Sequence, residues 1–194
     1  MPHRFHPEPF AGNGFAQPYS DTPLDGEIVG ENVYLNIINR ARKYVYICTP
    51  YLIIDNEMMT ALCLASKKGV DVRIITPGIP DKKLVFLLTQ SYYQQLLAAG
   101  VRIYEYTPGF VHAKIFTSDD EKAVVGTINL DYRSLYLHFE CAAFLYQVEE
   151  ITEIEKDFQR TLEKCQEVTL ENRKKGTFFL RLEGWLLKWL APLM

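Results

Sequence analysis

The stretch YVYICTPYLIIDNEMMTALCLASKKGVDVRIIT, residues 44–76, decides the fold class of this chain. It opens with a β-branched and aromatic run, YVYICT (44–49), which predicts a buried strand that ends at Pro50. Residues 56–68 follow with helical spacing of their apolar side chains, and VDVRIIT (70–76) predicts a second strand. Strand, helix and strand at this spacing are typical of a βαβ unit, in which the two strands run parallel.

The same alternation continues outward on both sides of this unit. Apolar side chains recur at helical spacing in residues 31–43 and 81–99, and the second of these segments is followed by a predicted strand at 101–106. Further along, the pattern predicts strands at 112–117, 122–127 and 140–147, a hairpin turn at 118–121 and a charged amphipathic helix at 149–167. The sequence therefore predicts an α/β domain with a mixed, mostly parallel β-sheet flanked by helices on both faces.

Three parts are expected along the 194 residues. Residues 1–27 are rich in Pro, Gly, Asn and Asp and predict an irregular leader, and residues 28–170 form the α/β domain. Residues 171–194 carry an amphipathic pattern that fits either a membrane surface or a helix packed on the sheet. No signal peptide and no run of roughly 20 apolar residues is present, so we expect a cytoplasmic protein whose membrane contact is peripheral.

Composition narrows the class of function. With 48% hydrophobic and 23% charged residues the chain can bury a sizeable core, and its net charge of -3 makes nucleic acid an unlikely partner. The four cysteines show no metal-ligand spacing and are expected to be reduced thiols: Cys48, Cys63, Cys141 and Cys165. Neither a metal nor another cofactor is therefore expected.

The strongest chemical signal is His112 followed by Lys114 on a predicted strand, where the two side chains point to the same face. An imidazole can attack phosphorus or protonate a leaving oxygen, while an ammonium group holds the negative charge of the transition state. This pair suits a phosphodiester and needs no metal.

Further candidates follow at the ends of the next strands. Thr127 and Asn129 stand two residues apart and offer a hydroxyl and an amide to phosphate oxygens. Glu140 opens the strand after them and is the candidate carboxylate that orients the ring of His112 and stabilises its charged form. A strand histidine is more often structural, but a second set of phosphate-compatible groups at short distance favours a functional site.

H-x-K-x-x-x-x-D at 112–119 followed by G-T-x-N at 126–129 resembles the HKD signature of the phospholipase D superfamily. Residues 17–194 are similar to its cardiolipin synthase branch, notably in the runs GVDVRIITPGIPDKK and YTPGFVHAKIFTSDDEKAVVGTINLDYRSLYLHFE. The resemblance implies these roles: a catalytic histidine, His112; a phosphate ligand, Lys114; phosphate-site residues, Thr127 and Asn129; and a carboxylate behind the histidine, Glu140. Asp119 completes the catalytic signature, but at a hairpin tip it is expected to brace the local fold. Arg133 and Ser134 also belong to the family pattern.

Enzymes of this family place two HKD copies face to face, and this chain carries one. The other histidines, His3, His6 and His138, have no lysine two residues later. The resemblance implies either a half enzyme that needs its missing first half, or a homodimer in which two copies of His112 meet across a two-fold axis.

The implied function is that of the C-terminal half of a cardiolipin synthase, peripheral on the cytoplasmic side of the cell membrane. Its partners would be phosphatidylglycerol and anionic membrane lipid. A histidine would attack the phosphodiester of phosphatidylglycerol and release glycerol, and a second phosphatidylglycerol would resolve the phosphohistidine. Two alternatives stay open: a single-HKD phosphodiesterase that acts on nucleic acid as a homodimer, and a non-catalytic fragment that binds lipid.

Overall fold

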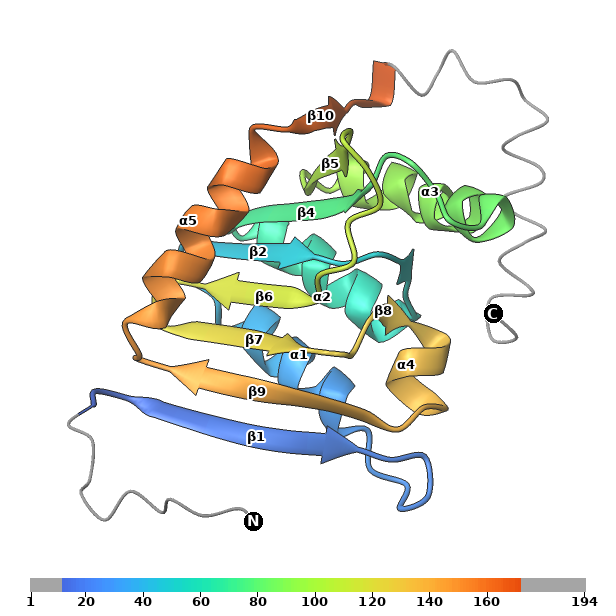
Figure 1. The fold of residues 1–194 in the computed structure, drawn as a ribbon. Helices are drawn as coiled ribbons and strands as arrows, with labels where there is room; N and C mark the ends of the chain where they lie inside the picture. Colours follow the sequence, from blue (N-terminus) through green and yellow to red (C-terminus); the bar gives the residue numbers. More distant parts are fainter. Residues whose placement is uncertain (1–11, 172–194) are drawn as a thin grey trace.

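A computed structural model describes residues 12–171 of the chain, which form ten strands and five helices (Figure 1). The strands are β1 (Phe15–Asp21), β2 (Tyr44–Cys48), β3 (Leu52–Ile53), β4 (Asp71–Pro77), β5 (Arg102–Tyr106), β6 (Ile115–Ser118), β7 (Lys122–Gly126), β8 (Leu130–Asp131), β9 (Glu140–Tyr146) and β10 (Cys165–Val168). The helices are α1 (Val29–Arg40), α2 (Asn56–Lys67), α3 (Lys83–Ala98), α4 (Tyr132–Tyr136) and α5 (Glu150–Leu162).

Eight strands form one sheet in the order β1-β9-β7-β6-β2-β4-β5-β10, and β3 pairs with β8 in a small second sheet. The βαβ unit predicted from residues 44–76 is confirmed, because β2 and β4 pair in parallel and are joined through α2. Strand β5 adds to β4 in parallel as well, while the other pairs of the large sheet are antiparallel. The mixed α/β sheet is thus confirmed, with its parallel pairing confined to β2, β4 and β5.

Helices cover both faces of the sheet, as predicted. Helices α1, α2 and α3 pack on one face over the main apolar core, where the Tyr34 ring of α1 stacks on Phe116 of β6 at 3.9 Å between centroids. Helix α5 crosses the opposite face, where Phe158 stacks on Tyr46 at 4.9 Å (Figure 1). These two cores fix the sheet between its helices.

The hairpin predicted at 118–121 is also confirmed. Asp119 and Asp120 adopt φ values of 58° and 60°, and the Glu121 N–H donates to the Ser118 carbonyl at 3.0 Å. Aspartate tolerates this left-handed backbone better than most residues, which explains the two adjacent aspartates in a tight turn.

Two predictions about the chain ends are wrong. Residues 15–21 are not part of an irregular leader but form β1, whose residues are mostly exposed and so show no alternation of apolar and polar side chains. Residues 165–168 are not the end of a helix but form β10, which pairs with β5. In both cases the backbone of an existing sheet edge stabilises a strand that local preference does not favour.

The predicted strand at 112–117 begins later than expected. Strand β6 starts at Ile115, so His112 and Lys114 lie in the extended segment that leads into it. Among residues 12–171, no helix is long and apolar enough to cross a membrane. The amphipathic pattern of residues 172–194 and the first eleven residues of the leader lie outside the described part.

Candidate active site

Backbone hydrogen bonds bring the predicted site residues to one edge of the sheet. The Lys114 carbonyl accepts the Gly126 N–H at 3.3 Å, and the Thr127 N–H donates to the Cys141 carbonyl at 2.9 Å. The start of β6, the end of β7 and the start of β9 therefore lie side by side. Four of the predicted residues are gathered at these strand ends: His112, Lys114, Thr127 and Glu140.

His112 and Lys114 differ sharply in their exposure. The His112 residue is exposed, and its ring lies 5.8 Å from that of Phe110. Lys114 is only 9% exposed, and its Nζ donates to the His112 carbonyl oxygen at 2.7 Å. Burial lowers the pKa of Lys114, against the opposing effect of the negative charges of Glu140 and Asp131. The His112 side chain is thus open to solvent, while the Lys114 ammonium group is buried and bonded to the backbone of the same segment.

Glu140 has partners other than the one expected from the sequence. Its carboxylate accepts a hydrogen bond from the Thr127 hydroxyl, and its Oε1 lies 3.7 Å from Nδ1 of His138. Within the described residues no contact joins it to His112, so the predicted pair of His112 and Glu140 is not formed. The Thr127 hydroxyl also accepts the Cys141 N–H at 3.1 Å. Its single proton is donated to Glu140, so it is not free for a phosphate oxygen in this arrangement.

Asn129 is placed by the short helix α4. Its Nδ2 donates to Oγ of Ser134 at 3.0 Å, while its Oδ1 is buried without a partner among the described residues. Asp131 caps the same helix by accepting the Ser134 N–H at 2.8 Å. The family-pattern Ser134 therefore positions Asn129 and the start of α4.

Two residues of the site escaped the sequence prediction. Asp131 is buried, and desolvation raises its pKa, against the hydrogen bond of the Ser134 N–H, that of Asn129 and the charge of His138. His138 contacts Glu140 although no lysine follows it. Asp131 has a readable signal, because aspartate is a preferred N-cap residue at the start of a helix. His138 has none, since only the path of the chain from α4 into β9 brings it to Glu140.

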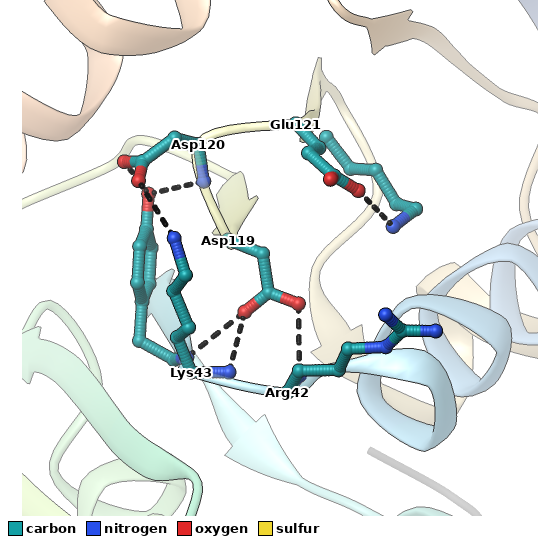
Figure 2. Close-up of polar contacts among 7 residues, drawn as sticks. Arg42, Lys43, Asp119, Asp120 and Glu121 are labelled. Carbon is teal, nitrogen blue, oxygen red and sulfur yellow. Dashed lines mark hydrogen bonds and ion pairs between the residues drawn. The ribbon is translucent and has the colours of Figure 1, made fainter.

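Asp119 lies at the far end of β6 from Lys114. Its carboxylate accepts the backbone N–H groups of Arg42 and Lys43, each at 2.8 Å, and of Tyr44 at 3.0 Å (Figure 2). Burial alone would raise its pKa, but these donors and the charge of Lys122 lower it. The contacts of Asp119 fit the bracing role expected from its place in the hairpin.

We expect Asp119→Ala to lower the free energy of unfolding by about 2–4 kcal/mol, because it leaves three N–H groups without their charged acceptor. Urea unfolding followed by circular dichroism measures this loss. Asp120→Ala is the matched control, since Asp120 sits beside it and bonds mainly to the Tyr44 hydroxyl; it should cost less than about 1 kcal/mol. Equal losses in the two variants would contradict the bracing role.

Two carboxyl groups, the buried Glu31 and the partly buried Asp55, contact Tyr136 of α4. The Tyr136 hydroxyl lies 2.8 Å from Oε2 of Glu31 and 2.8 Å from Oδ2 of Asp55. One hydroxyl proton satisfies only one of these oxygens, so a carboxyl proton is needed for the other contact. Burial, helped by the bond to Asp55, raises the pKa of Glu31 to about 7. Glu31 is therefore the group that carries this proton.

This proton predicts a pH dependence of stability. Between about pH 4.5 and 7 the folded chain holds a proton on Glu31 that the unfolded chain has lost, so the free energy of unfolding falls as pH rises through this interval. Glu31→Gln mimics the protonated acid and should be more stable than the wild type by about 2 kcal/mol at pH 8, with little difference at pH 4.5. Urea unfolding across this range tests it, with the exposed Glu163→Gln as control. A constant difference at all pH values would refute it.

Metal ligands are not assembled in the described part of the chain. Residues 12–171 contain no group of three or more His, Cys, Asp or Glu side chains placed to hold a metal ion. The four cysteines are free thiols, of which Cys48 is buried and Cys141 exposed. Whether the reaction needs a metal remains a prediction for a chelator experiment.

Comparisons with known proteins agree on the class of this fold. The family model described as the cardiolipin synthase, phospholipase D-like domain matches residues 34–162. The chain is 58% identical to an uncharacterized protein of Streptococcus mutans, over 94% of this chain and 40% of that protein. It is 39% identical to a cardiolipin synthase of Halalkalibacterium halodurans, over 86% of this chain and 33% of that enzyme. Nuc, a phospholipase D family member from Salmonella typhimurium, superimposes with a TM-score of 0.69 at 16% identity, over 81% of this chain and 99% of that one.

The fold is thus that of the phospholipase D superfamily. Within it, this chain belongs to the family of cardiolipin synthase phospholipase D-like domains, whose model covers most of its length. The chain spans 33–40% of the length of the two relatives named above.

Proposed function

We propose that this chain is a phosphatidyltransferase half-domain of the cardiolipin synthase type. In this reaction a histidine attacks the phosphorus of phosphatidylglycerol, glycerol leaves with a proton, and the hydroxyl of a second phosphatidylglycerol displaces the histidine to give cardiolipin. The carrying observation is the exposed imidazole of His112 beside the buried ammonium of Lys114 at one sheet edge.

Each group of the site has a role in this proposal. His112 acts as nucleophile or as general acid and base, and Lys114 holds the negative charge of the phosphoryl oxygens. Glu140, fixed by the Thr127 hydroxyl, faces His138 and supplies a negative charge near Lys114. Asn129 keeps a buried amide oxygen for a donor such as a substrate hydroxyl.

In this mechanism a second histidine must come from outside these 194 residues, since one imidazole cannot stand on both sides of phosphorus and no other histidine here has a lysine two residues later. The single HKD copy and the share of 33–40% of the relatives' length support a partner that supplies the first half. A second copy of this chain is the other source, and the membrane surface is the proposed place of action. The net charge of -3 favours a lipid substrate over nucleic acid.

The test is an assay of the purified chain, alone and with the first half of a related synthase, on vesicles of phosphatidylglycerol. Cardiolipin and free glycerol are the expected products, and dialysis against EDTA should leave their rate unchanged. A parallel assay with single-stranded DNA tests the phosphodiesterase alternative. Cleaved DNA without cardiolipin would refute the proposal and support that alternative. Binding to vesicles without any product would instead support a non-catalytic fragment that binds lipid.

A further inference from the structure

Exposed apolar side chains gather around the candidate active site. Residues 12–171 contain nine exposed large apolar side chains. Four of them lie in the connections that leave the site edge of the sheet, and a fifth lies in the first turn of α3, directly after one of these connections. We call these five the apolar rim: Leu24 (81% exposed), Ile79 (52%), Leu84 (57%), Leu137 (57%) and Phe139 (71%). A scattered apolar side chain on a surface is ordinary, but a group around a site marks an interaction surface.

The strand directions place the whole rim at one edge. Strand β1 ends at Asp21, which pairs with the first residue of β9, Glu140, so the connection that carries Leu24 leaves the sheet beside the site. Leu137 and Phe139 lie between α4 and β9 and flank His138, the partner of Glu140. In Figure 1 these connections stand at the right-hand edge, where the arrows of β1 and β7 point.

Two further observations describe where the members of the rim lie. The connection from β1 to α1 and the end of α4 line the same pocket of about 220 Å³, so Leu24 and Leu137 project from neighbouring segments. Ile79 lies in the connection from β4 to α3 and Leu84 in the first turn of α3, and both are exposed, as are Asp81, Lys82 and Lys83 between them. The two lysines place cations between Ile79 and Leu84, whereas Leu24 lies next to the exposed Asp25 and Glu27.

We propose that the apolar rim inserts into the surface of an anionic bilayer and presents the His112 edge to the phosphodiester groups of the lipids. The inference rests on the proposed function, since a lipid phosphodiester lies directly above apolar acyl chains. The same edge carries the matching groups: exposed apolar side chains, the exposed Lys82 and Lys83 between two of them, and the exposed imidazole of His112. Separate exposed apolar side chains with cations nearby suit a bilayer surface, whereas a protein interface packs an apolar core as densely as a protein interior.

Single tryptophans report the insertion directly. The background carries Trp185→Phe and Trp189→Phe, and one new tryptophan is placed by Phe139→Trp. The matched control is Phe15→Trp, because Phe15 is 72% exposed but lies at the opposite edge of the sheet, where β1 begins. The probes are vesicles of phosphatidylcholine with and without phosphatidylglycerol, some with brominated acyl chains. We expect a blue shift and quenching by bromine for Phe139→Trp on the anionic vesicles, and neither change for Phe15→Trp.

A binding measurement adds an independent readout. Leu137→Ser with Phe139→Ser should weaken partition onto phosphatidylglycerol vesicles by about tenfold or more, while Phe15→Ser should leave it within about a factor of two. An unchanged emission of Phe139→Trp on vesicles would overturn the proposal. A blue shift that follows protein concentration without lipid would also overturn it, because a second copy would then cover the rim.

These readouts need no turnover and should be the same in a His112→Ala background. Insertion without cardiolipin formation in the presence of a first half would refute the proposed function and leave the rim intact. Cardiolipin formation without insertion would refute the rim alone.

Discussion

His112→Ala is expected to abolish the phosphatidyl transfer of the assembled enzyme, with a loss of roughly 10²- to 10⁴-fold or more in kcat. In the proposed mechanism the imidazole forms or resolves the bond to phosphorus, and the methyl group of alanine cannot replace it. Lys114→Ala should be nearly as severe, because no other buried cation lies at this edge among the described residues. Formation of cardiolipin from labelled phosphatidylglycerol is the measurement.

The matched control is His6→Ala, the same chemical change outside the HKD motif, which should keep the rate of the wild type. Circular dichroism and urea unfolding of the His112 variant must show an intact fold, since His112 is exposed and makes no packing contribution to the core. Retention of more than about a tenth of the activity would remove His112 from the mechanism.

A monomer of this chain is expected to be inactive by itself. If a second copy completes the site, specific activity should rise with protein concentration and follow the dimer fraction seen in sedimentation. If the first half of a synthase completes the site, activity should appear only when that half-domain is added. It should saturate at one added half-domain for each copy of this chain. Full turnover by a species that sediments as a monomer at the assay concentration would contradict both.

Mixing wild-type and His112→Ala chains distinguishes a homodimer from a complex with a first half. In a homodimer that needs two copies of His112, addition of His112→Ala chain should lower the activity of the wild type, because mixed dimers hold one functional histidine. With a heterologous first half, the same variant competes only for that half, and more of the half should restore the rate. Lys114→Ala in the mixture serves as the matched variant with an intact imidazole.

The centre of the fold was predictable because its strands are buried and therefore carry a clear apolar pattern. The run at 44–49 is buried at nearly every position, so its apolar pattern identifies β2 directly. Strands β1 and β10 were missed because their side chains are largely exposed and the sheet edge supplies the hydrogen bonds. The sequence of β1 or β10 alone does not show that a distant strand will offer it a sheet edge.

The candidate site shows the same division. That His112 and Lys114 lie together was predictable from their spacing, because residues two positions apart on one segment stay close in space. The partner of Glu140 was mispredicted, since which strand end faces which depends on the register of β7 and β9. That register aligns Gly126 with Ala142 and brings Thr127, not His112, to the carboxylate.

Strand β6 separates His112, just before its start, from Asp119, in the hairpin turn after its end. Three hydrogen bonds tie the Asp119 carboxylate to the backbone at the start of β2. We expect loss of this anchor to loosen β6 and so to disturb the position of His112, since a catalytic group tolerates little displacement. Loss of turnover alone would therefore make both His112 and Asp119 look catalytic. Thermal unfolding separates them, because we expect only the Asp119 variant to lose stability.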